Sequence, residues 1–227
     1  MPVRQAVVTY LTKLTLMPQK VLYLQGFGAG EEGLSRALAD ALGPSYQVLT
    51  PSFDWLKPVE TAKALDAVYR AHADDAPVIV GIALGGFFAN YLAREFGSPA
   101  LLVNPILVPG KALGEFGAVL EILDSYRQLE ALEAQQTTLP LRRIVLGMQD
   151  RIVNHAENGL RLRDDARLVF LNMGHRVEPE YVATVASLVR ELAGSPVEPM
   201  FSQEDYLELK LAACSAPMRT VASLERA

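Results

Sequence analysis

The chain alternates short apolar runs with longer segments whose apolar residues recur at helical spacing. The apolar runs predict buried β-strands, and the spaced segments predict amphipathic helices between them. Strands that alternate with helices favour a three-layer α/β fold, in which helices cover both faces of a mostly parallel sheet of about six strands. The expected strands are 21–24, 46–49, 77–81, 100–103, 143–147 and 168–171, and the expected helices are 34–42, 59–72, the segment after Gly85, and 181–192.

The segment 105–140 shows no strand pattern. Its apolar residues recur at helical spacing from Phe116 to about Leu132, which predicts a helical cap insertion lying over the top of the sheet. We therefore expect one domain over residues 1–194. Residues 195–227 are expected to form an extension with one short helix, because Ser202 and Asp205 resemble a capping box. Residues 1–20 fit a helix or an alternating strand equally well.

One glycine-rich turn stands between the expected strand at 77–81 and the helix that follows. Its spacing, Gly81-x-Ala83-x-Gly85, is that of a nucleophile elbow, a tight strand-to-helix turn that exposes its middle residue. Here the middle residue is alanine. Plain close packing of helix on strand remains an alternative reading of the glycines. A phosphate-binding loop is disfavoured, since the spacing matches neither dinucleotide nor P-loop patterns.

Three positions that directly follow expected strands suggest a catalytic arrangement. Ala83, Asp150 and His175 occur in the order nucleophile, acid, histidine that the α/β-hydrolase fold uses. Ligands of parallel sheets bind at the carboxyl ends of the strands, so these positions are expected to meet there. The histidine would then act as general base, and the acid would fix its tautomer. Taken singly, Asp150 and His175 are ordinary turn and loop residues.

Composition and charge narrow the function classes. The 227 residues are 50% hydrophobic and 21% charged, which suits one globular domain with a full core. The net charge of −5 and the scattered basic residues predict no nucleic-acid or anionic-membrane partner. No apolar run reaches bilayer length and no signal sequence is evident, so we expect a cytoplasmic protein.

The remaining chemistry-bearing residues offer little further function. The single cysteine, Cys214, is expected to be a packing residue, and one cysteine fits a reducing compartment. His72 and His155 are expected on solvated helix faces. They have no ligand-spaced partners, so neither a metal nor another cofactor is expected.

Several segments together resemble the small YqiA-like (UPF0227) esterase family of α/β-hydrolases. They cover roughly residues 20–193. Each is moderately specific, but they occur in the family's order and spacing. The matching segments are Val21 to Phe27, the elbow Gly81 to Gly86, Val103-Asn104-Pro105 with Pro109, Gln149-Asp150 with Val153-Asn154, and Gly174-His175.

The resemblance implies roles for residues of this chain, and the chain departs from the family at two of them. The family has serine where this chain has Ala83, and its first loop typically reads His-Gly-Phe where this chain has Gln25-Gly26-Phe27. The backbone N–H groups of Leu84 and Phe27 are expected to form the oxyanion hole. The expected substrate pocket comprises Gln25, Gly26, Asn104, Phe87 and Phe116, of which the two phenylalanines also fit a purely structural role in the core.

Two hypotheses follow. In the first, the protein is a serine-type hydrolase of a carboxylic ester or related acyl compound, and Ala83 is an inactivating substitution of the serine. In the second, it is a natural pseudo-hydrolase that binds a ligand or a protein without turnover. The extension after Ser195 is also the candidate segment for forming a homo-oligomer.

Overall fold

A computed structural model of the chain describes residues 18–26, 32–115, 117–138, 140–153, 155 and 168–194. Gln19 and Lys20, which the sequence left between helix and strand, belong to the first strand. The extension 195–227 and its expected helix lie outside the described residues. Among the helices described, none is long and apolar enough to cross a membrane.

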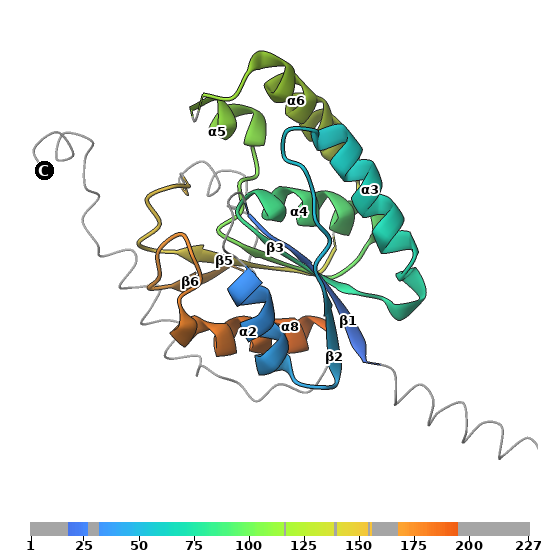
Figure 1. Ribbon diagram of the computed structural model, residues 1–227, viewed down its shortest axis with the longest axis vertical. Helices are drawn as coiled ribbons and strands as arrows, with labels where there is room; N and C mark the ends of the chain where they lie inside the picture. Colours follow the sequence, from blue (N-terminus) through green and yellow to red (C-terminus); the bar gives the residue numbers. More distant parts are fainter. Residues whose placement is uncertain are drawn as a thin grey trace, which may run out of the picture. The chain divides into compact units, whose positions relative to one another are not determined.

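The core of the fold is a six-stranded sheet in which every neighbouring pair of strands is parallel. The order of the strands across the sheet is β2-β1-β3-β4-β5-β6. This arrangement confirms the predicted parallel sheet of about six strands (Figure 1). The strands are β1 (Gln19–Leu24), β2 (Tyr46–Leu49), β3 (Val78–Ile82), β4 (Ala100–Val103), β5 (Arg142–Gly147) and β6 (Leu168–Leu171).

Helices cover the sheet on both faces, as the three-layer prediction requires. Helices α2 and α8 pack against each other on one face, while α3 and α4 pack on the other (Figure 1). The helices are α2 (Glu32–Leu42), α3 (Pro58–Arg70), α4 (Leu84–Phe96), α5 (Pro109–Glu115), α6 (Leu120–Gln135) and α8 (Val182–Leu192), with short 3₁₀ turns η1 (Ala73–Asp75) and η2 (Pro179–Tyr181).

The chain reverses its direction across the sheet between β1 and β3. From β1 it first moves outward to β2, and α3 then carries it back past β1 to β3. Such a switch point leaves a crevice at the carboxyl ends of β1 and β3, where open parallel sheets bind ligands. Gln25 follows one of these strands and Ala83 follows the other.

Alternation along β3 assigns its side chains to the two faces. A Cβ at Gly81 would meet Cβ of Ala89 in α4 at 2.5 Å, so position 81 faces α4. Because side chains alternate along a strand, the next residue, Ile82, faces α2 and α8. All five residues of β3 are buried, which is expected of a central strand covered on both faces.

The insertion between β4 and β5 forms an outer helical layer. Helices α5 and α6 pack on each other, and α6 also packs on α3 and α4. Tyr126 of α6 is buried against Phe87 and Phe88, and its hydroxyl donates to the carbonyl of Trp55 at 2.9 Å. The main contacts of α6 are therefore with the helices of one face, which differs from the expected position over the top of the sheet.

A buried polar network fixes α6 to α4. Glu133 accepts from the amide of Asn90 at 2.9 Å and pairs with Arg94 at 3.0 Å. Arg142 of β5 in turn donates to the amide oxygen of Asn90 at 2.9 Å. Since buried charges are stable only when paired and hydrogen-bonded, this network defines one position for α6 against the sheet. On the other face, the guanidinium of Arg190 in α8 donates to the carbonyl of Ala41 in α2.

Candidate active site

Ala83 occupies the turn between β3 and α4 in a strained backbone conformation. Its φ of 49° and ψ of −116° lie where residues other than glycine are rarely found. Such a conformation costs roughly 1–3 kcal/mol and persists only where the surroundings impose it. The sequence predicted a tight turn here with position 83 at its apex, and the backbone has that form.

Three glycines allow the turn to form, because a side chain at any of them would collide with its neighbours. A Cβ at Gly81 would lie 2.4 Å from the carbonyl oxygen of Gly85, and a Cβ at Gly85 would lie 2.2 Å from that of Leu24. A Cβ at Gly86 would meet Cβ of Pro105 at 2.7 Å. The helix can thus start directly against the ends of β1 and β3, as in a nucleophile elbow.

Hydrogen bonds hold the apex between β3 and the segment after β4. The N–H of Ala83 donates to Val103 at 3.0 Å, and its carbonyl accepts from Ile106 at 2.9 Å. The same carbonyl accepts from the N–H of Gly86 at 3.0 Å. Ala83 is 3% exposed. Backbone hydrogen bonds therefore hold the apex in place, and its methyl group is buried.

Asp150 and His175 follow β5 and β6, and they contact each other. Nδ1 of His175 lies 2.9 Å from Oδ2 of Asp150, and the Asp150 side chain is 0% exposed. A carboxylate only accepts hydrogen bonds, so Nδ1 of His175 carries the proton and its other ring nitrogen, Nε2, is left for a substrate or nucleophile. The contact expected from their order in the chain is present, while their catalytic roles remain predictions.

The carboxylate of Asp150 is held in its ionised form. Burial alone would raise its pKa, but hydrogen bonds from His155, His175 and the N–H groups of Ile152 and Val153 outweigh burial, and the pKa falls well below the usual value. The two N–H groups donate to Oδ1 at 2.8 and 3.1 Å. One negative charge is therefore available at this edge of the sheet to orient an imidazole ring.

His155 is a second histidine on the same carboxylate oxygen. Its Nε2 lies 3.1 Å from Oδ2 of Asp150, and its side chain is 18% exposed. The prediction that His155 lies on a solvated helix face is therefore wrong. The two histidines contact the aspartate directly, and no group of three or more His, Cys, Asp or Glu side chains in the described ranges could hold a metal ion.

Asn104 joins three segments of the site. Its side-chain amide donates to the carbonyls of Gly174 and His175, each at 2.9 Å, and its side-chain oxygen accepts from the N–H of Gly147 at 2.6 Å. The residue is 0% exposed and has a φ of 44°, a left-handed value that asparagine tolerates better than most residues. Asn104 is therefore a buried brace and not the pocket-lining residue that the sequence predicted.

This brace connects the apex to the histidine. Val103 and Ile106, which hold Ala83, flank Asn104, which holds the carbonyl of His175. Gly147 permits this approach, because a Cβ there would lie 2.4 Å from the carbonyl oxygen of Gly174. The ends of β3, β4 and β5 thus meet the loop after β6 through backbone and amide contacts.

The other predicted site residues have mixed outcomes. Leu84 begins α4, so its N–H belongs to the first turn, whose N–H groups have no acceptor within the helix. Gln25 is half-buried and Gly26 is buried at the end of β1. Phe87 is buried against Phe88 and Tyr126, and so belongs to the core instead of the pocket. Phe27 and Phe116 lie outside the described residues.

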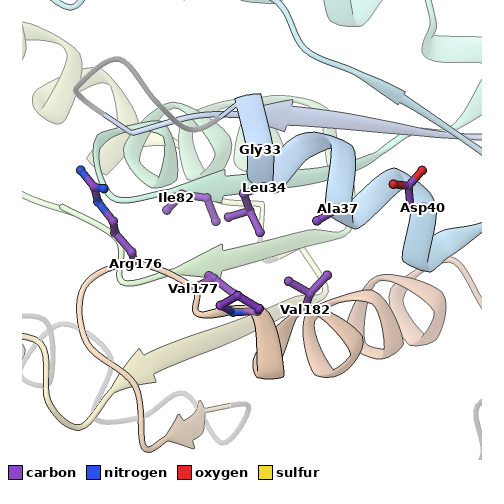
Figure 2. A pocket seen from close by; sticks show the side chains of 9 residues that line it. Gly33, Leu34, Ala37, Asp40, Ile82, Arg176, Val177 and Val182 are labelled. Atoms are coloured by element: carbon purple, nitrogen blue, oxygen red, sulfur yellow. The ribbon is translucent and has the colours of Figure 1, made fainter.

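A cavity of about 510 Å³ lies beside the apex, on the face covered by α2 and α8 (Figure 2). Ile82, the residue before Ala83, lines it together with Arg176 and Val177, which follow His175. Leu34 of α2 and Val182 of α8 lie on its two sides. Of the residues predicted to line a pocket, the described ones, Gln25, Gly26, Phe87 and Asn104, are not among those lining this cavity.

Sequence reasoning also missed His155, although a signal was available. The residue is five positions after Asp150, close enough in the chain for its ring to fold back on the carboxylate. The amide of Asn104 left no comparable signal, because its partners are 70 and 71 residues away.

Comparisons with known proteins agree with the fold. The model of the uncharacterised protein family UPF0227 matches residues 20–177. A UPF0227 protein from Shewanella woodyi is 31% identical over 97 residues, which are 39% of this chain and 52% of that protein. The chain thus spans about half the length of the curated relative it matches.

Solved structures with a similar fold include two proteins of low sequence identity. The esterase domain of a Rhodothermus marinus protein superposes with a TM-score of 0.60 at 15% identity, covering 78% of this chain and 87% of that one. The α/β hydrolase domain-containing protein 10 from mouse superposes with a TM-score of 0.60 at 12% identity, covering 77% and 89%. These likenesses show that the fold is that of the α/β hydrolases.

Proposed function

The chain belongs to the uncharacterised protein family UPF0227, and we propose that it is a serine-type hydrolase of a carboxylic ester or related acyl compound whose nucleophile position is occupied by alanine. Ala83 is then an inactivating substitution of serine. The proposal combines the α/β-hydrolase fold with the arrangement at the carboxyl edge of the sheet.

One observation carries the proposal. Ala83 keeps the strained backbone of a nucleophile elbow while Asp150 and His175 keep their hydrogen bond at 2.9 Å. A methyl group gains nothing from this conformation, whereas a hydroxyl at the same position would be presented to a substrate. Asp150 and His175 are the two side chains that a serine at position 83 would need to complete a triad.

With serine at position 83, we expect the reaction steps of a serine triad. His175 accepts the hydroxyl proton at Nε2 as the oxygen attacks the carbonyl carbon, and Asp150 stabilises the imidazolium through Nδ1–H. The N–H groups of Leu84 and Phe27 hold the developing oxyanion, assisted by the N-terminus of α4. His175 then returns the proton to the departing alcohol, and water releases the acid from the serine by the same steps.

Without that hydroxyl, the chain is expected to be essentially inert. Removal of a triad nucleophile leaves only the catalysis that the oxyanion hole and substrate binding supply. The protein with Ala83 should nevertheless bind the substrate, because the hydrogen bonds that hold the turn come from the backbone of residue 83.

Restoring the hydroxyl tests the proposal. Ala83→Ser should hydrolyse an aryl acetate at least about a thousandfold faster than the protein with Ala83, given the size of nucleophile effects in such triads. The matched control is Ala83→Ser combined with His175→Ala, which should return the rate to the starting level. If the single variant hydrolyses acetate, butyrate and octanoate aryl esters no faster than the alanine protein, the proposed activity is wrong.

A pseudo-hydrolase is the second candidate, favoured by the alanine itself and by the cavity beside it. In this case Ala83 is the natural residue and the pocket binds a ligand without turnover. Codon 83 in the source organism separates the two functions, since a native serine there excludes the second. Equilibrium binding of an aryl ester without its consumption supports the second only where that codon encodes alanine.

A further inference from the structure

The cavity beside the apex has an apolar lining. Its volume of about 510 Å³ is within the usual range of small-molecule sites, roughly 300–1,000 Å³. Figure 2 shows it between α2 and the segment that leads from His175 into α8. The apolar side chains that line it are Leu34, Ala37, Ile82, Val177, Pro179 and Val182.

The cavity lies next to the position where the carbonyl of an acyl compound would bind. Ile82 is covalently next to the nucleophile position, and its side chain faces the cavity side of the sheet. Helix α2 begins shortly after the loop that starts with Gln25 and Gly26, where the oxyanion hole is proposed. Arg176, which also lines the cavity, directly follows His175. The chain neighbours of position 83 and of His175 therefore both line the cavity.

The two charged residues of the lining lie at its opposite ends. Arg176 follows His175 directly, whereas Asp40 is near the far end of α2 (Figure 2). From Gly33 to Asp40 the helix rises by about 10 Å, at about 1.5 Å per residue. An extended alkyl chain with C–C bonds of about 1.5 Å covers this distance with about eight carbons.

We propose that this cavity is the acyl-chain site, and that it takes an unbranched, uncharged chain of about eight carbons. The proposal rests on the proposed function of the elbow. The apolar walls favour burial of methylene groups at roughly 0.8 kcal/mol each, so affinity should rise with each carbon until the chain reaches Asp40. A carboxylate at the end of the chain would face the negative charge of Asp40 and should be rejected.

The first experiment varies the acyl chain and the cavity together, in the full-length Ala83→Ser protein. An aryl octanoate should have a kcat/KM at least about tenfold higher than the aryl acetate, because about six further methylene groups are buried. Ala37→Leu, which fills the cavity from α2, should lower kcat/KM for the octanoate at least about tenfold and leave the acetate within about twofold. Val182→Phe fills it from α8 and should do the same.

The matched control is Ala39→Leu, the same substitution on the same helix outside the cavity lining. It should leave the ratio of octanoate to acetate unchanged. Asp40→Asn should raise kcat/KM for the aryl half-ester of octanedioic acid by up to about fivefold, since Asp40 is exposed, without changing that for the octanoate. A parallel series of acetates with longer alcohols should be insensitive to Ala37→Leu. If that series responds and the acyl series does not, the assignment to the acyl chain is overturned.

A binding measurement separates this inference from the catalytic proposal. The protein with Ala83 should bind octanoate in a calorimetric titration, and Ala37→Leu should weaken binding at least about tenfold, while Ala39→Leu should not. Hydrolysis of the acetate without any effect of chain length or Ala37→Leu would reject the acyl site but keep the hydrolase. Octanoate binding that depends on Ala37, with no hydrolysis of any ester by Ala83→Ser, would reject the hydrolase but keep the site.

Discussion

On the face that carries α3 and α4, aromatic side chains and a buried polar network pack against the sheet, whereas the face that carries α2 and α8 has a cavity of about 510 Å³ among the described residues. The filled face has three rings in contact, of Phe87, Phe88 and Tyr126, and a buried network around Glu133. On the hollow face, the guanidinium of Arg190 in α8 donates to the carbonyl of Ala41 in α2. The difference indicates that one face fixes the elbow and the other leaves room for a ligand.

Glycine substitutions should produce the largest contrast between the faces. Gly85→Ala would place a Cβ 2.2 Å from the carbonyl oxygen of Leu24, and neither backbone can move away without breaking the sheet. We expect no cooperatively folded protein. Gly33→Ala on α2 meets nothing within 4 Å and should raise the free energy of unfolding by about 0.5 kcal/mol. Circular dichroism and urea denaturation measure both, and a well-folded Gly85→Ala variant would refute the tight contact.

Removing the buried charge of the filled face should have the next largest effect. Glu133→Ala leaves Arg94 and Asn90 without their shared acceptor and should lower the free energy of unfolding by about 3–5 kcal/mol. Glu133→Gln retains an acceptor and should cost less. Arg190→Ala, which removes the polar link of the hollow face, should cost about 1 kcal/mol. If Glu133→Ala and Arg190→Ala lower the free energy of unfolding equally in urea denaturation, the two faces do not differ in the way proposed.

Acid should weaken the carboxyl edge of the sheet, which lies between the two faces. The pKa of Asp150 is lower in the folded chain than in the unfolded one, so its contribution to stability is present above the unfolded value of about 3.9 and is lost as the pH falls further toward the folded value. Asp150→Asn should lower the free energy of unfolding by about 1–3 kcal/mol at pH 7.

The measurement is urea denaturation of both proteins at pH 7, 4 and 2.5. The difference between them should shrink only below about pH 4. Asp40→Asn, at an exposed carboxylate of α2, should change the free energy by less than about 0.5 kcal/mol at each pH. If Asp150→Asn lowers the free energy of unfolding by the same amount at all three pH values, the pKa of Asp150 is not lowered by folding, and this prediction is wrong.

Filling the cavity should slightly raise the stability of the protein. Ala37→Leu adds apolar volume to the cavity and should raise the free energy of unfolding by up to about 1 kcal/mol. Ala89→Leu adds the same volume to α4, opposite Gly81, and should lower it by about 1–3 kcal/mol. A loss of stability from Ala37→Leu as large as that from Ala89→Leu would mean that the hollow face is packed like the filled one.

Most of the fold could be predicted because its signals are local. The strands 46–49 and 168–171 have the bounds that their apolar runs predict, and the elbow follows from three glycines within six residues. The meeting of Asp150 with His175 followed from chain order and a general property of parallel sheets.

The parts that could not be predicted depend on contacts between distant segments. A phenylalanine at helical spacing looks the same whether it faces a pocket or the core, and Phe87 faces the core because α6 covers it. Asn104 after a strand looks like a ligand-binding residue until its partners, about 70 positions away, are known. The cavity lies between α2 and the segment that leads into α8. It depends on how the two segments pack together, so the sequence of either segment alone does not predict it.

Backbone hydrogen bonds of residue 83 and its neighbours hold the elbow. Position 83 is therefore a place where side chains of similar size can be exchanged while these bonds are kept. Serine adds one oxygen atom to the alanine side chain, and cysteine adds one sulfur atom. Rates measured on the three proteins would therefore compare the intrinsic reactivity of oxygen and sulfur in the same surroundings. The protein with alanine at position 83 thus provides the baseline for measuring what a hydroxyl there would contribute.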